Sequence, residues 1–350
     1  MKTKRIFALM LVLTMAVTLL AGCGSSSGST AGSSSSSTEA APAAEEAPAK
    51  GSIQIKYSTW ANDGEAAYEG MKMFKQYIEE DSDGVIEVLL YPGDQAGTTD
   101  EQVEQVSMNQ LQMMSSGDPG IVEIEYLCLP YLFDGLDKYT EFLESELGQQ
   151  YAQKSIDERN TRIIDTLPRS PRIISCNLPI YTLADMKGLK LRAPSKDYYV
   201  DTFTALGANP TTMGMSEIYS AMQTHVVEGQ ENPIETIVSY GFQNVNQYLI
   251  MSNHIIKPAF VLINNDFFTG LPEEYQEMIV DCCARARAYA EEYMEEAMDR
   301  DLQTCIDAGM EVIEPDLTEW IEATQSVRDN LGVKTWGEEG YAFIKQIAEG

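Results

Sequence analysis

The sequence predicts an α/β fold, because stretches with strand-like and helix-like hydrophobic patterns alternate along most of the chain. The alternation is visible in residues 53–118 and again in residues 189–226. A third observation is residues 272–309, a helical stretch with proline at its start, glycine at its end and no helix breaker between them. A chain of 350 residues is long enough for about two domains.

The first expected elements bring an aromatic side chain to the end of a strand. Residues 53–57 alternate apolar and polar side chains, and this strand is expected to end near Trp60. A helix should follow, because four apolar residues have helical spacing: Ala67, Met71, Phe74 and Ile78. The apolar run 85–91 is then expected as a buried strand.

The next segment predicts a helix followed by a polar loop. Thr99 and Gln102 have the spacing of a capping box at a helix start. Residues 111–114 are expected as a strand that opens into a loop containing Ser115, Ser116 and Asp118. The remaining elements expected before residue 180 are one helix and two strands, over residues 136–158, 162–165 and 172–176.

Residues 189–233 contain a second strand, helix, strand, helix unit. Its first strand should stop at Ala193-Pro194, which places Arg192 at the strand end. Ser216 can cap the second helix, whose expected apolar positions are Ile218, Tyr219, Met222 and Val226. Residues 229–233, GQENP, are expected to turn the chain sharply. Because α/β folds bind ligands at loops that leave strand ends, this unit holds the candidate site.

Five short stretches of residues 188–254 occur in a family-specific order: GLKLRAP, ALGANPTTM, SEIYSAMQT, VVEGQENP and NQYLIMSNH. They resemble the DctP-type extracytoplasmic solute-binding subunits of tripartite ATP-independent periplasmic (TRAP) transporters. The resemblance implies a two-lobed, type II-like periplasmic-binding-protein fold with crossing hinge strands. It also implies that the long helix spans both lobes and that the C-terminal tail packs on the second lobe. The implied lobes are residues 51–170 plus 258–297 and residues 171–257 plus 298–350.

The resemblance also implies which residues bind the solute. In this family the arginine of the GLKLR strand, here Arg192, forms a salt bridge to a solute carboxylate. The asparagine of the QENP segment, here Asn232, contacts the ligand as well. The family has a second ligand arginine twenty positions before the first. Arg172 has this spacing in the present sequence. Trp60 and Met215 are expected to form walls of the pocket.

Each of these residues also has a purely structural interpretation. An arginine at a strand end is often a surface charge, and this applies to Arg169 as well as to Arg172. Ser115 and Ser116 could supply hydroxyl contacts or hold a turn. Gln230 is a candidate ligand residue, although holding its turn is the favoured role.

The overall charge excludes some partners. With 24 basic and 54 acidic residues the net charge is −30, which argues against nucleic acid or an anionic membrane surface as a partner. An anionic solute would also be repelled at long range. The repulsion is screened over about 8 Å at physiological salt, so arginines in direct contact with the solute should dominate.

The N-terminus predicts export and lipid anchoring. Residues 1–22 contain a basic start and a short apolar run, which is typical of a signal peptide. The ending LAGC resembles a lipobox, so Cys23 is expected to be lipidated, with an ordinary signal peptide as the alternative. Residues 23–50 are then a Ser, Gly, Ala, Pro and Glu-rich tether. We expect the protein on the outer face of the cell membrane or in the periplasm.

The remaining reactive residues point to binding rather than catalysis. The other five cysteines have no metal or disulfide-framework spacing and are expected to be buried apolar residues. With two histidines, no convincing catalytic or metal set can be assembled. We expect no cofactor, and a monomer that delivers a small carboxylate to TRAP permease subunits. The alternatives are a secreted enzyme acting on a carboxylated sugar and a sensor subunit for a membrane kinase.

Overall fold

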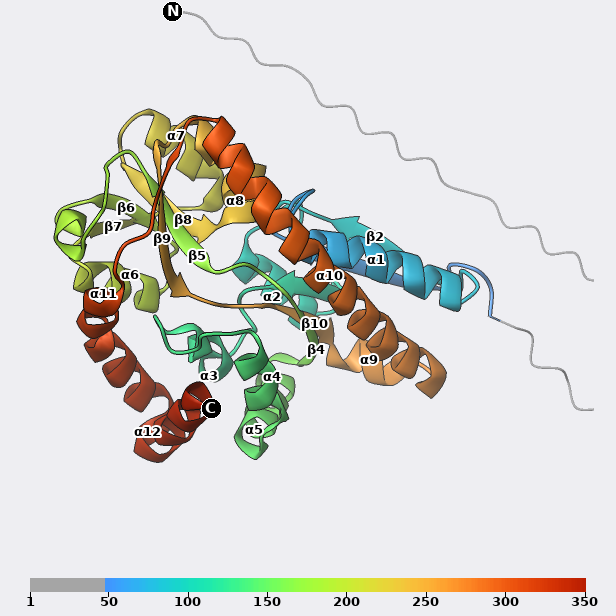
Figure 1. The fold of residues 1–350 in the computed structure, drawn as a ribbon. Helices are drawn as coiled ribbons and strands as arrows, with labels where there is room; N and C mark the ends of the chain where they lie inside the picture. The colour runs from blue at the N-terminus through green and yellow to red at the C-terminus, as the bar shows by residue number, and fades with distance from the viewer. Residues whose placement is uncertain (1–47) are drawn as a thin grey trace, which may run out of the picture. The chain divides into compact units, whose positions relative to one another are not determined.

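Two β-sheets carry the fold of residues 48–350, the part of the chain that this computed structural model describes (Figure 1). The first sheet has the strand order β2-β1-β3-β10-β4. Strands β1, β2 and β3 are parallel, and β10 runs antiparallel to β3 and β4. Its strands are β1 (Ile53–Thr59), β2 (Ile86–Tyr91), β3 (Met113–Ser116), β4 (Thr161–Leu167) and β10 (Ala259–Asn264).

The second sheet has the strand order β11-β9-β5-β8-β6-β7. Strand β5 runs antiparallel to both β8 and β9, and β6 runs parallel to β7 and β8. Its strands are β5 (Arg172–Cys176), β6 (Lys190–Ala193), β7 (Asn209–Thr212), β8 (Gly229–Pro233), β9 (Tyr248–Ile255) and β11 (Glu311–Ile313).

Helices pack against both sheets. Their bounds are α1 (Ala66–Asp81), α2 (Thr99–Ser107), α3 (Val122–Glu125), α4 (Asp137–Glu144), α5 (Glu146–Arg159), α6 (Asp197–Ala205), α7 (Ile218–Gln223), α8 (Ile234–Ser239), α9 (Asn265–Gly270), α10 (Glu273–Asp307), α11 (Thr318–Ala323) and α12 (Gln325–Glu349). Short 3-10 turns lie at Tyr126–Cys128, Leu183–Met186, Met215–Glu217 and Phe242–Asn244. The expected stripe of α1 is confirmed, because all four of its residues are buried.

The chain crosses between the sheets at two connecting segments. Residues 168–171 lead from β4 in the first sheet to β5 in the second, and residues 256–258 lead from β9 back to β10. The predicted crossing strands are therefore confirmed.

The long helix α10 packs on elements of both sheets. Its 35 residues correspond to about 52 Å. It contacts α1 and β4 of the first sheet and α8, which follows strand β8 of the second (Figure 1). This agrees with the expected spanning helix.

The C-terminal helix α12 does not pack on the second sheet's elements alone. It contacts α6, which lies between two strands of that sheet, and also α4 and α3. The expected packing of the tail on the second lobe stays a prediction, and α12 contacts α3 and α4 in addition to α6. The lobe boundaries stay a prediction.

The GQENP segment is a strand, and the predicted sharp turn was wrong. Residues Gly229–Pro233 form β8, which pairs along its whole length with β5. All five residues are buried. Gly229 permits this pairing, because a Cβ there would lie 2.6 Å from the carbonyl oxygen of Ser175. The chain turns only after Pro233, where α8 begins.

Several predicted helix bounds and caps differ from those in the structure. The helix expected over 136–158 is divided at Ser145, which caps α5 by accepting a hydrogen bond from the Gly148 N–H. The capping box of α2 is formed by Thr98 and Glu101, one residue earlier than predicted.

Near the candidate site the bounds also differ from expectation. Strand β3 includes Ser115 and Ser116, so both serines belong to the sheet and not to the loop after it. Ser216 lies inside a 3-10 turn and does not cap α7. On that helix and its end, Tyr219 is 37% and Val226 58% exposed, and neither belongs to the core. Their place is taken by Ala221 and Val227, which are buried.

The five cysteines of the described residues are free and buried, as expected: Cys128, Cys176, Cys282, Cys283 and Cys305. Burial raises the pKa of each thiol. In residues 48–350 no helix has the length and apolar content needed to cross a bilayer. The signal-peptide prediction, the lipidated Cys23 and most of the predicted tether lie outside the described residues.

Candidate functional site

Arg192 is a buried cation without a carboxylate partner among residues 48–350. It lies in β6 and is 5% exposed. Its Nε and Nη2 both donate to the carbonyl oxygen of Met213, at 3.1 and 2.9 Å. No other hydrogen bond or ion pair of its side chain is found in the described residues. The outer edge of the guanidinium, formed by Nη1 and the second hydrogen of Nη2, therefore remains available to a ligand.

Burial acts against the charge of Arg192. Removal from water lowers the pKa of Arg192 to about 10, and the neighbouring charge of Arg172 acts in the same direction, while Glu231 opposes it. The side chain still carries its proton at neutral pH. A buried arginine that keeps its charge but lacks a counter-ion is costly, and an anionic ligand would remove that cost.

Arg172, by contrast, has a carboxylate partner inside the protein. It is 4% exposed, and its Nε and Nη2 bind the two carboxylate oxygens of Glu231 at 2.5 and 2.8 Å. Nη2 also donates to the Asn232 Oδ1 at 2.9 Å. Burial opposes its charge, but the carboxylate of Glu231 raises the pKa of Arg172 above its usual value. Only Nη1 of Arg172 is left for a ligand.

The same carboxylate binds a buried histidine. His254 Nε2 donates to the Glu231 Oε2 at 3.1 Å, and its Nδ1 accepts from the Ser252 hydroxyl at 2.9 Å. Burial alone would raise the pKa of Glu231, but Arg172 and His254 lower it to about 2. Burial lowers the pKa of His254, so this residue is neutral and holds the carboxylate in place.

We expect this network to make the fold sensitive to acid. A carboxylate whose pKa falls from 4.5 to about 2 on folding adds about 3 kcal/mol at neutral pH. Because the folded pKa is the lower one, the contribution is complete above about pH 4.5 and is lost as the pH falls towards 2. His254 adds to the loss below pH 6.5, since only the unfolded chain takes up that proton readily.

Thermal melts of the wild type and Glu231→Gln between pH 7.5 and 3 would measure this effect. The difference in stability between the two proteins should narrow as the pH falls below 4.5. A difference that stays constant over this range would contradict the assignment.

The amides of β8 extend the network. Asn232 Nδ2 donates to the Gln230 Oε1 at 2.6 Å, and Gln230 Nε2 donates to the Ser175 hydroxyl at 2.8 Å. Met215 Sδ lies 4.0 Å from the Asn232 Nδ2. Three of the predicted ligand residues, Arg172, Asn232 and Gln230, thus lie in one continuous set of contacts, and Met215 borders it.

The first sheet supplies the other predicted residues. Trp60 directly follows β1, and Ser115 and Ser116 end β3, so all three lie at the carboxyl edge of parallel strands. The Ser116 hydroxyl accepts from the Asp118 N–H at 2.9 Å, which holds the loop after β3. The Ser115 hydroxyl is enclosed and has no hydrogen-bond partner in the described residues.

Similarity to known proteins shows the family of this chain. Residues 57–334 match the model of the DctP family, described as bacterial extracellular solute-binding protein, family 7. The chain belongs to this family. The predicted resemblance is therefore confirmed.

Two curated relatives are similar in sequence to this solute-binding protein over most of its length. The chain is 32% identical to the sialic acid-binding periplasmic protein SiaP of Vibrio cholerae over 229 residues, which cover 64% of this chain and 71% of SiaP. It is 27% identical to the C4-dicarboxylate-binding periplasmic protein DctP of Rhodobacter capsulatus over 302 residues, which cover 84% and 90%.

Solved structures of TRAP solute-binding proteins have the same fold. One from Roseobacter denitrificans with bound L-galactonate is 25% identical, with a TM-score of 0.76, and the match covers 85% of this chain and 99% of that one. One from Desulfovibrio salexigens with bound orotic acid is 24% identical, with a TM-score of 0.77 and the same coverage. The predicted α/β fold of the periplasmic-binding-protein type is thereby confirmed.

Sequence reasoning missed two charged residues of the solute-binding protein's interior. Arg169, interpreted as a possible surface charge, is 6% exposed and lies over the Trp60 ring, 4.5 Å from the ring centroid. Lys257 in the second connecting segment is also buried, and its Nζ donates to the Tyr198 hydroxyl at 2.9 Å. Both flank the loop after β3: a Cβ on Gly117 would lie 3.6 Å from the Arg169 Nη1 and 3.5 Å from the Lys257 Cε. The position of both residues between the crossing strands was the available signal.

Contacts between the two sheets' loops enclose this region. Lys196 at the start of α6 binds Asp118 at 2.7 Å, and Tyr126 donates to Asp197. On the other side, Thr236 and Ser239 of α8 donate to the Glu65 carboxylate at 2.8 and 2.9 Å. These contacts join residues that follow strands of different sheets.

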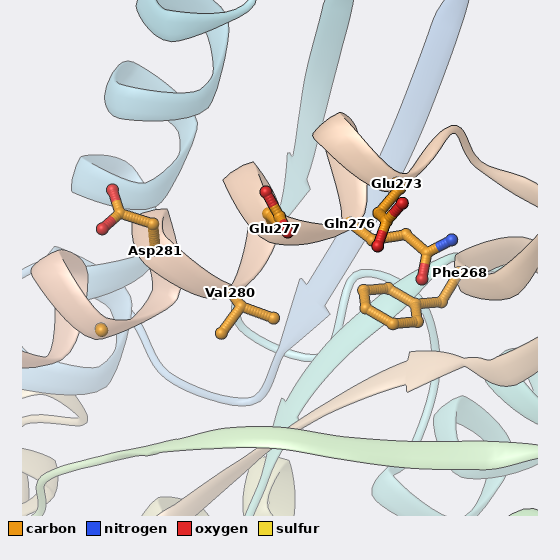
Figure 2. Close-up of a pocket in the computed structure, with 7 residues that line it drawn as sticks. Phe268, Glu273, Gln276, Glu277, Val280 and Asp281 are labelled. Atoms are coloured by element: carbon orange, nitrogen blue, oxygen red, sulfur yellow. The ribbon is translucent and has the colours of Figure 1, made fainter.

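A separate hollow on the outside of α10 contains none of the predicted residues. Figure 2 shows its lining, which includes Phe268, Glu273, Glu277 and Asp281, and its volume is about 590 Å³. Asp281 also lies near Asp81 and Cys282 in an arrangement that could suit a metal ion. Arg285 binds both aspartates, at 2.5 and 3.1 Å, and offsets part of their charge.

Proposed function

We propose that this protein captures a small organic acid outside the cytoplasm and delivers it to a TRAP-type permease. The observation that carries the proposal is the buried guanidinium of Arg192, whose outer edge has no protein partner in the described residues. A guanidinium edge matches a carboxylate with two parallel hydrogen bonds. Arg192 is therefore the primary carboxylate-binding residue of the proposal.

Similar proteins support a carboxylate as the ligand class. The relatives bind, by their names, sialic acid and C4-dicarboxylates, and a solved structure contains L-galactonate. These ligands share a carboxylate and differ in the rest of the molecule. The shared group fits Arg192, and the remaining residues would select among acids.

The other predicted residues have distinct roles in this proposal. Arg172 is neutralised by Glu231, so it contributes one N–H group and orients Asn232. Asn232 and Gln230 are already bonded to each other, and they hold the polar side chains of β8 in place. Met215 and Trp60 supply apolar walls, and Ser116 holds the loop after β3. Ser115 is fully enclosed beside the buried Tyr57, so it supports the strand and not the ligand.

The local charges must overcome the net charge of −30. Screening limits the repulsion between a solute and distant carboxylates to about 8 Å at physiological salt. Within the enclosed site the attraction to Arg192 is several-fold stronger than in water. Capture is then governed by this arginine at short range.

The contacts between the sheets' loops describe a closed form. A solute that binds both sheets stabilises this form relative to an open one, and the gain in affinity on closure drives the motion. Lys196 bound to Asp118 adds an ion pair that exists only when the loops meet. Closed and open forms present different surfaces to the permease, which provides a basis for recognising the loaded protein.

The proposal includes location and partners. A lipid on Cys23 would hold the protein at the outer face of the cell membrane, and residues 23–50 would act as the tether. The chain would act as a monomer together with the permease subunits, and it would release the solute unchanged, without catalysis.

A thermal-shift screen of the full-length protein tests the proposed ligand class. A ligand at a hundred times its Kd adds about 2.7 kcal/mol of stability. Dicarboxylates, keto acids, sialic acids, and aldonic and uronic acids should include stabilising compounds, and the amide of each active acid should have no effect. Equal stabilisation by an amide, or no response to any acid, would contradict the proposal. NMR of the recovered ligand would distinguish binding from enzymatic conversion.

A further inference from the structure

Arg169 is a second buried cation whose side chain has no protein partner in the described residues. It lies in the connecting segment between β4 and β5 and is 6% exposed. Its guanidinium carbon lies over the face of the Trp60 ring, 4.5 Å from the ring centroid, which is a cation–π contact. None of its nitrogens donates a hydrogen bond within residues 48–350, and no carboxylate there lies within ion-pair distance. Fully enclosed polar atoms without a hydrogen bond occur in the described residues, but the Arg169 nitrogens are not among them. A water-sized group can therefore still reach these nitrogens.

The two nearest carboxylates are bound to other groups. Glu235 accepts from the N–H and the hydroxyl of Ser170. Glu65 accepts from Thr236 and Ser239. Both act on Arg169 only at longer range, and burial lowers the pKa of Arg169 despite them.

The burial of Glu65 weakens that compensation further. Removal from water and the charge of Glu235 raise the pKa of Glu65, which favours its neutral form. Lys257 adds positive charge nearby, because it lies against the same glycine, Gly117, as the Arg169 Nη1. The surroundings of Arg169 therefore suit an additional anion.

Arg169 and Arg192 face the site from different sheets. Arg169 lies at the carboxyl edge of the first sheet, against Trp60 after β1 and Gly117 after β3. Arg192 lies in β6 of the second sheet. Arg172 lies between them in sequence, and its positive charge lowers the pKa of both arginines. A solute between the sheets would thus meet one unpaired guanidinium on each side.

We propose that Arg169 binds a second acidic group of the solute, so that the protein selects diacids over the corresponding monoacids. The inference rests on the proposed function, with Arg192 binding the first carboxylate. Trp60 positions the Arg169 guanidinium by stacking, which keeps its edge directed away from the ring. The competing explanation is that Arg169 is a structural residue that Glu65 and Glu235 stabilise at a distance.

Calorimetry with matched acids separates these explanations. We would take the monoacid that binds most tightly in the screen and the diacid in which its far terminal group is a carboxylate, for example galactonate and galactarate. The wild type should bind the diacid at least about thirtyfold more tightly. Arg169→Gln should weaken the diacid about a hundredfold and the monoacid less than threefold. Arg169→Lys, which keeps the charge, should restore part of the preference for the diacid.

Three results would overturn the inference. One is a wild type that binds the monoacid as tightly as the diacid. Another is an equal loss for both acids in Arg169→Gln, which is the signature of a structural role. The same holds if Arg169→Gln fails to fold and Arg169→Lys loses both acids equally. Arg159→Gln, which removes an exposed arginine, is the control for net charge. Loss of both acids in Arg192→Gln, together with an unselective Arg169→Gln, would leave the proposed function standing and refute only this inference.

Discussion

Arg192→Gln should weaken binding of the acid by at least about 3 kcal/mol, which is a loss of roughly a hundredfold or more in affinity. The variant removes the edge that would bind the carboxylate, and the shorter glutamine replaces it with an uncharged amide. The ligand-free variant should be as stable as the wild type or more stable, because an unpaired buried cation has been removed. Calorimetry and thermal melts of the same preparations would measure both effects.

Two further variants define the role of this residue. Arg192→Lys keeps the charge but not the two-pronged edge, so we expect it to bind the acid almost as weakly as Arg192→Gln. The exposed Arg159→Gln should bind normally. Near-normal affinity in Arg192→Gln would refute the assignment. A large loss of ligand-free stability would show that Arg192 is a structural residue.

Glu231→Gln should destabilise the protein by about 3–5 kcal/mol, because it leaves Arg172 buried without its counter-ion. For a domain of this size the melting temperature would fall by about 6 °C or more. His254 would lose the carboxylate that its Nε2 binds. Melts of the ligand-free protein at pH 7.5 would measure the change.

A double variant tests whether the pair acts as a unit. Arg172→Gln with Glu231→Gln removes both charges, so it should be less destabilised than Glu231→Gln alone. The control is Glu158→Gln, which removes an exposed carboxylate 3.9 Å from Lys154 and should change stability by less than about 1 kcal/mol. Equal stability of Glu231→Gln and the wild type would show that Arg172 does not depend on this partner.

Local sequence patterns predicted the parts of the fold that depend on local periodicity. The stripe of α1 and the uninterrupted run of α10 require only helical spacing and the absence of breakers, and both are found as expected. The crossing strands followed from the family resemblance, and a strand over residues 172–176 was expected as well. The arginine of β6 was identified by its motif and its place at a strand end.

The remainder depends on contacts between distant residues. GQENP has the composition of a turn, yet it forms a buried strand because β5 pairs with it and Arg172, His254 and Ser175 bind its polar side chains. The burial of Arg169 could not be read from its neighbours in sequence, because Trp60 and Gly117 cover it from other elements. The pairing of Arg172 with Glu231 was missed for the same reason.

The unpaired guanidinium groups of Arg169 and Arg192 have a consequence for transport without cargo. If the empty carrier shut, two largely buried cations would lack a directly bound counter-ion, at several kcal/mol each. The empty carrier is therefore biased towards the open state, and only a loaded one stays shut. A permease that admits the shut state alone would then avoid futile visits by empty carriers, because the cargo itself supplies the charge that the protein lacks.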